Sequence, residues 1–119
     1  MQIQINTDHN IEGHEALATQ VRGVVESALR HISEHITRVE VHLSDDSSHK
    51  SSQNDKRCMM EARLEGHQPI AVTNQAATLD QAVDGAAEKL TKLIESTLER
   101  LHDQERHRTD PPLPGSIDG

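Results

Sequence analysis

The sequence predicts an α+β domain with the element order β-α-β-β-β-α, in which two helices pack on one face of a four-stranded sheet. Two observations predict this fold. Two long segments carry apolar residues at three- and four-residue spacing, and four short segments alternate apolar with polar residues. At 119 residues the chain is long enough for one domain with a core and too short for two. We therefore expect one domain over residues 1–102 and a disordered polar tail over 103–119.

The first strand and the first helix are separated by a change of period. Ile3 and Ile5 alternate with polar residues, which predicts a half-buried strand. Residues 8–13 are expected to turn the chain. From about residue 15 to 34 the apolar residues recur at helical spacing, which predicts an amphipathic helix.

Three further strands are predicted over residues 37–43, 57–64 and 70–73 from the same alternation. Residues 44–56 contain almost no apolar side chain, so a long loop is expected between the second and third strands. One face of the sheet would be covered by the helices and the other left open to solvent. The inward positions are Val39, Val41, Leu43, Cys58, Met60, Ala62, Leu64, Ile70 and Val72.

The segment from Thr78 to Leu101 predicts the longest helix. Thr78 can cap its first turn, and Asp80 and Asp84 lie where the helix dipole favours negative charge. After His102 the apolar spacing stops, and three of the four prolines follow. The apolar stripe comprises Leu79, Val83, Ala86, Leu90, Leu93, Ile94, Leu98 and Leu101.

Composition excludes several classes of function. The chain has no Phe, Tyr or Trp, so it cannot bind single-stranded nucleic acid by stacking bases on aromatic rings. A net charge of -8 argues against nonspecific binding to phosphate backbones, DNA included. No leader-like or membrane-spanning run is present, and the single cysteine suits a reducing compartment, so we expect a cytoplasmic protein without membrane partners.

No catalytic, metal or cofactor site is predicted. His31 and His35 have α-helical spacing for a metal pair, but no third ligand is implied, and we interpret both as solvated. Cys58 alternates with inward residues and is interpreted as a buried small hydrophobe. The aspartates around residues 45–55 depart from the calcium-loop pattern. We therefore predict that the protein is not an enzyme.

Six basic residues remain as candidates for binding. Lys89, Lys92 and Arg100 lie off the apolar stripe of the long helix, and Arg38, Arg57 and Arg63 are expected on the open face of the sheet. From the residues alone, ordinary surface charge balanced by nearby glutamates is the favoured interpretation.

The start of the chain, MQIQINTDHNIEGHEAL, and the segment from Val72 to Leu101 with its TLDQAVDGAAEKLTKL core resemble the short ribosome hibernation-promoting factor and ribosome-associated inhibitor family (sigma-54 modulation protein, S30EA). The resemblance spans about residues 1–101 and includes the order of elements. Its most specific pattern, A-[IV]-D-x-x-x-x-K-L-x-[RK], is met by Ala82, Val83, Asp84, Lys89, Leu90 and Lys92.

The resemblance implies a fold like that of double-stranded-RNA-binding domains and a non-enzymatic bacterial stress factor without a cofactor. Such a factor would occupy the decoding channel of the small ribosomal subunit, contact 16S rRNA and inhibit translation. Lys89, Lys92 and Arg100 match basic positions of the family's last helix. With Arg38, Arg57 and Arg63 they form the expected rRNA-binding set, in which cations neutralise phosphates.

The sequence also departs from the family's pattern. Glu95 to Leu98 replace several lysines, and Val24 and Ser27 fall where relatives tend to carry lysines. Asp80 stands in place of an aromatic residue. The resemblance therefore implies a divergent acidic member, and an alternative stays open: an acidic protein-interaction module that keeps the fold but has lost most rRNA contacts, with weak self-association as a further option.

Overall fold

The structure, a computed structural model, describes residues 1–8, 14–45 and 55–109. The predicted α+β order is confirmed. The turn expected after the first strand and most of the loop between the second and third strands lie outside the described residues. The elements are β1 (Gln2–Thr7), α1 (His14–Leu29), the 3₁₀ helix η1 (Arg30–His35), β2 (Ile36–Asp45), β3 (Lys56–Leu64), β4 (Ile70–Ala76) and α2 (Leu79–Thr109).

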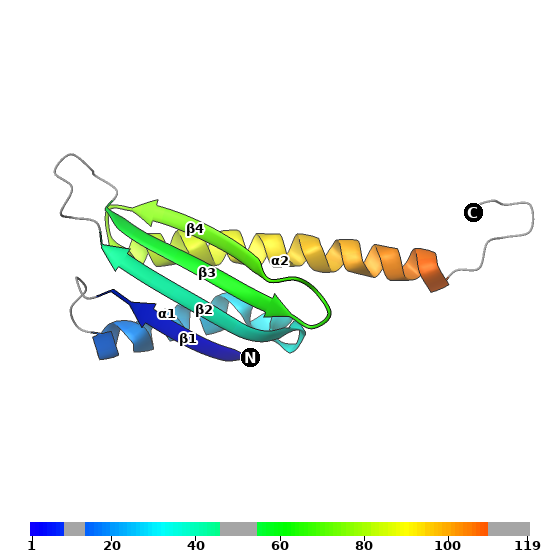
Figure 1. Ribbon diagram of the computed structural model, residues 1–119, viewed down its shortest axis with the longest axis horizontal. Coiled ribbons are helices and arrows are strands. Elements are labelled where there is room, and N and C mark those ends of the chain that lie inside the picture. The colour runs from blue at the N-terminus through cyan, green and yellow to red at the C-terminus, as the bar shows by residue number, and fades with distance from the viewer. Residues whose placement is uncertain (9–13, 46–54, 110–119) are drawn as a thin grey trace, which may run out of the picture.

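The four strands form one mixed sheet in the order β1-β2-β3-β4. β1 runs parallel to β2, while β2, β3 and β4 pair antiparallel. The parallel pair follows from the crossover through α1, since adjacent parallel strands cannot be joined by a tight turn. Both helices lie on one face of the sheet, and none of the described elements covers the other face (Figure 1).

The core is built from aliphatic side chains and sulfur, as the absence of aromatic residues requires. In the middle of the sheet, Val39 and Val41 of β2 pair with Ala62 and Met60 of β3, and all four side chains are buried. α2 covers them with a buried stripe that includes Leu90. The alternation predicted for the strands is therefore confirmed.

α2 begins against β4 through a close approach at Gly85. A Cβ at Gly85 would lie 2.2 Å from the Nδ2 atom of Asn74. That amide donates to the carbonyls of Gln81 (3.3 Å) and Ala82 (3.2 Å) in the first turns of α2. Thr78 caps the helix, because its Oγ1 accepts the backbone N–H of Gln81 at 3.1 Å.

Both predicted helix ends differ from the structure. α1 ends at Leu29, and the chain continues as 3₁₀ helix rather than α-helix to residue 34. α2 continues to Thr109 instead of ending near Leu101, and projects beyond the sheet (Figure 1). Residues 102–109 contain no Gly or Pro, so nothing interrupts the helix before Pro111. The division of the chain into a domain and a disordered tail stays a prediction.

Candidate nucleic-acid interface

The carboxylates of α2 gather on the side that faces α1 and η1. Asp80 accepts a hydrogen bond from Gln20 of α1 at 2.8 Å, and Glu95 lies 2.6 Å from Nε2 of His31 in η1. At 3.6 residues per turn, the other carboxylates described on α2 fall in the same sector. We call this set the acidic stripe: Asp80, Asp84, Glu88, Glu95 and Glu99.

Two of the predicted binding residues lie on the opposite side of α2. The Nζ atom of Lys89 donates to the carbonyl oxygen of Thr73 in β4 at 3.2 Å. Helical spacing places Leu93 and Arg100 on the same side as Lys89. Leu93 is 39% exposed, which is high for a large apolar side chain. We call Lys89, Leu93 and Arg100 the β4 flank.

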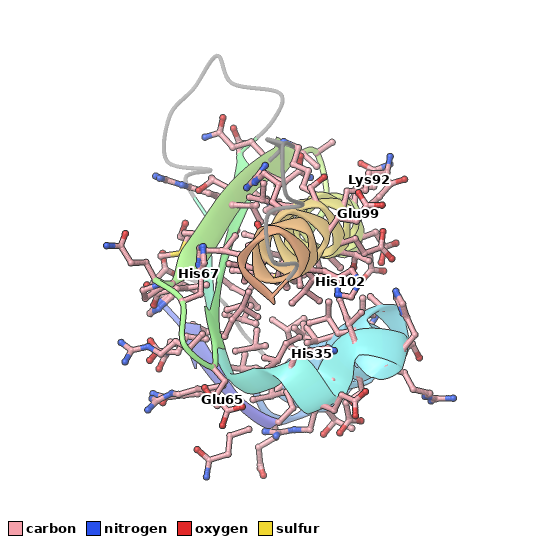
Figure 2. The ribbon with its side chains drawn as sticks, turned by 90° about the vertical axis from the view of Figure 1, so that its right-hand side faces the viewer. His35, Glu65, His67, Lys92, Glu99 and His102 are labelled. Atoms are coloured by element: carbon pink, nitrogen blue, oxygen red, sulfur yellow. The ribbon has the colours of Figure 1, made fainter. Side chains whose placement is uncertain are left out.

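Lys92 lies at the edge of the acidic stripe, next to Glu88 and Glu99. Its ammonium lies 3.6 Å from the carboxylate of Glu88, with both side chains more than two-thirds exposed. Figure 2 shows Lys92 and Glu99 on the side of α2 turned away from the sheet. A pair this exposed contributes little energy, but it places a carboxylate beside the lysine and weakens the local positive potential.

The three arginines predicted on the open face of the sheet are there, at two separate places. Arg38 of β2 is paired in register with Arg63 of β3, whereas Arg57 lies at the other end of β3, opposite Ser44. Between these places Glu40 faces Glu61, a like-charge pair that a nearby cation must compensate. Arg38 does so, since its guanidinium lies 3.0 Å from Glu40.

The six predicted residues therefore do not form one continuous band. The structure brings Lys89 and Arg100 to one side of α2 and Arg38 and Arg63 to adjacent positions on the open face. Lys92 lies on the adjoining side of α2, beside Glu88, and Arg57 lies at the other end of β3.

Sequence reasoning missed Arg22 of α1. Its guanidinium donates to the carbonyl of Ile3 in β1 at 3.1 Å, and it lines a small hollow together with Arg38. β1 and β4 are the edge strands of the sheet, so Arg22 and Lys89 each place a helix cation on an edge strand. No pattern in the sequence marks Arg22, because only the packing of α1 decides which strand it reaches.

Residues 3–102 match the protein family described as "Sigma 54 modulation protein / S30EA ribosomal protein". The chain belongs to this family. The resemblance inferred from the sequence is thereby confirmed, and with it membership of a non-enzymatic, ribosome-associated family. A search of curated proteins by sequence gives no match.

Two solved structures are similar to this S30EA family member. The Thermus thermophilus Protein Y N-terminal domain has a TM-score of 0.63 and 20% identity, over 82% of this chain and 99% of that chain. A ribosomal subunit interface protein from Coxiella burnetii has a TM-score of 0.64 and 17% identity, over 83% and 99%. At such low identities the likeness shows the fold alone.

The other candidates considered from the sequence of this S30EA family member are His31, His35 and Cys58. His31 and His35 lie in a 3₁₀ helix, where side chains three residues apart align, so their predicted placement on one α-helical face is wrong. Within residues 1–8, 14–45 and 55–109, no three His, Cys, Asp or Glu side chains are grouped to hold a metal ion. Cys58 is 0% exposed, which confirms it as a core side chain, and this burial raises the pKa of its thiol to about 12. None of the helices described is apolar over enough length to cross a bilayer.

Proposed function

We propose that this protein binds the small ribosomal subunit through 16S rRNA in the decoding channel and inhibits translation in the cytoplasm of stressed bacteria. The family match over residues 3–102 carries the proposal. The names of the similar structures, a Protein Y domain and a ribosomal subunit interface protein, support it.

The distribution of charge on α2 supports RNA binding despite the net charge of -8. The acidic stripe faces α1 and η1, so RNA that approached along β4 would meet Lys89 and Arg100 first. The ammonium of Lys89 uses one of its three N–H donors for the carbonyl of Thr73, and its positive charge and two further donors can interact with a phosphate. Structured RNA is recognised largely through its shape and its phosphates, which requires no aromatic side chain.

Co-sedimentation with 30S and 70S particles across a series of salt concentrations tests the proposal. The expected result is binding at low salt that falls steeply as salt rises, because phosphate contacts release counterions. A Lys89→Gln, Arg100→Gln variant should bind more weakly and with a salt slope lower by about two, one unit for each lost contact. Lys92→Gln, which removes a charge already beside Glu88, serves as the control and should change binding less.

Absence of the protein from ribosomal fractions at the lowest salt would refute direct binding. It would favour the alternative of an acidic protein-interaction module. The pairing of Lys92 with Glu88 and of Arg38 with Glu40 supports that alternative, since both pairs occupy cations of the expected rRNA-binding set.

A further inference from the structure

A cleft of about 1240 Å³ opens between the second half of α2 and η1. Its origin is the early end of α1. The chain turns through η1 into β2, while α2 runs on past the end of the sheet, and none of the described elements fills the space between them. In Figure 2, His102 of α2 and His35 of η1 lie on opposite sides of this space.

The cleft has an apolar floor. Ile32 of η1 and Leu98 and Leu101 of α2 line it, and both leucines keep part of their surface exposed. The volume exceeds that of typical small-molecule sites, and the cleft is open along one side, so it suits a short stretch of polypeptide better than a metabolite.

The rim of the cleft is predominantly acidic. Glu65, Glu95 and Glu99 line it together with His35, Ser96 and His102, and Glu95 also lies 2.6 Å from Nε2 of His31. The one lysine in this lining, Lys92, lies 3.6 Å from a further carboxylate, Glu88. Glu95 and Glu99 are the end of the acidic stripe, which extends about 29 Å along α2 at ~1.5 Å per residue. An incoming cation therefore meets negative charge along the whole side of α2 that leads to the cleft.

The charge of the cleft disfavours the chain's own C-terminus as its occupant. Residues 110–119 contain Asp110 and Asp118 and no lysine or arginine, so their sign is the same as that of the rim. A second copy of this chain, with a net charge of -8, is disfavoured for the same reason.

We propose that this cleft is a docking site for a lysine- and arginine-rich segment of a partner protein that carries a leucine-type anchor. The anchor packs on Ile32, Leu98 and Leu101, and the cations lie along Glu95 and Glu99 of the acidic stripe. The site lies on the side of α2 opposite the β4 flank, so the protein can hold a basic polypeptide and RNA at once. The inference does not depend on rRNA binding, because it uses none of the β4-flank residues.

A fluorescein-labelled peptide, Arg-Leu-Lys-Arg-Leu-Lys, added to the full chain tests the proposal by fluorescence anisotropy. We expect saturable binding that weakens as salt rises, because the rim charges are exposed to solvent. A Glu95→Gln, Glu99→Gln variant should bind the peptide at least about fivefold more weakly, which is the loss of affinity expected when two exposed charge pairs are removed. Leu101→Ser should weaken binding as well.

Two controls separate docking in the cleft from general attraction to an acidic protein. A Glu15→Gln, Glu26→Gln variant makes the same charge change on α1, away from the cleft, and should leave the affinity unchanged. A peptide with serine in place of both leucines should bind at least fivefold more weakly if the apolar floor contributes.

Methyl NMR spectra of the same titration locate the peptide, and the proposal expects the largest shifts at Ile32, Leu98 and Leu101. Absence of binding at low salt overturns the proposal. Equal affinity for both peptides, or equal losses in the two double variants, also overturns it. So do shifts confined to the open face of the sheet, or cleft shifts produced by an RNA hairpin instead of the peptide.

Discussion

The two sides of α2 differ both in packing and in charge. On the β4 side, Gly85 lies against Asn74 without room for a Cβ, and Lys89 donates to a carbonyl of the edge strand. On the α1 side, contact is made through polar side chains such as Gln20 with Asp80, and a Cβ at Gly23 of α1 would meet nothing within 4 Å.

On each side of α2, the sign of the charged side chains matches the hydrogen-bonding groups that the neighbouring element presents. An edge strand presents backbone carbonyls, which attract the donors of lysine and arginine. α1 and η1 present donors to α2, namely the amide of Gln20 and the imidazole of His31, and these attract carboxylates. One helix can therefore keep a cationic side on a chain whose net charge is -8.

The largest expected effect is on the core that both sides of α2 share. Leu90 is 0% exposed, so Leu90→Ala should lower the free energy of unfolding by about 2–5 kcal/mol. Leu93→Ala, on the β4 flank, should change it by no more than about 0.5 kcal/mol. Urea unfolding of both variants measures this, and similar losses would show that α2 is rotated from the orientation described.

Cys58 tests whether either side of α2 opens in the native state. Its thiol is buried beneath α2, and burial raises its pKa from 9.0 to about 12. Ellman's reagent at pH 8 should therefore react with it only after denaturant is added. Reaction of the native protein at the rate of a free thiol would mean that one side of α2 separates from the sheet.

The same raised pKa predicts loss of stability in alkali. The contribution of the buried Cys58 thiol to the free energy of unfolding is fully present below pH 9, where the thiol of the unfolded chain is also protonated. It falls by about 1.4 kcal/mol per pH unit as the pH rises from 9 toward 12, because only the unfolded chain can ionise there. Urea unfolding at several pH values measures the slope, and Cys58→Ala should reduce it.

Substituting one glycine on each side of α2 compares the packing of the two sides directly, because Gly85 lies against β4 and Gly23 lies in α1. Gly85→Ala should destabilise the protein by about 1 kcal/mol, since the new methyl group displaces Asn74 and its two hydrogen bonds. Gly23→Ala should stabilise it by about 0.5–1 kcal/mol through helix propensity alone. Thermal unfolding measures both. In an Asn74→Ala background, Gly85→Ala should become stabilising; persistent destabilisation there would contradict the contact.

The smallest expected effect concerns the contact between His31 and Glu95 on the α1 side. Their side chains are 55% and 48% exposed, so solvent screens the pair. His31→Gln should change the free energy of unfolding by no more than about 0.5 kcal/mol. A loss above about 1.5 kcal/mol in urea unfolding would show that this contact, rather than apolar packing, holds α2 to η1.

Most of the fold could be predicted from local patterns. Alternation in the segments of β2 and β3 identified the inward side chains, because a strand with one buried face must alternate. Thr78 was identified as a cap because the first turn of a helix needs acceptors. The helix ends were not predicted correctly: η1 still buries Ile32 like the helix before it, and α2 continues beyond Leu101 without apolar spacing.

The candidate interface was predicted less completely. The positions of Arg38, Arg57 and Arg63 on the open face follow from strand alternation, and the spacing of the acidic stripe is present in the sequence. Lys92 and Lys89 cannot be told apart in this way, because both lie off the apolar stripe. Their separation depends on where β4 lies and on the nearby Glu88.

By itself, the sequence determined which side chains face the core and how charge is arranged around α2, since both follow from the periods of strand and helix within one segment. Only the tertiary structure decided that the cationic side of α2 meets β4 and that its acidic side borders a cleft. These depend on the order of the strands and on the early end of α1, which arise from contacts between segments far apart in the chain.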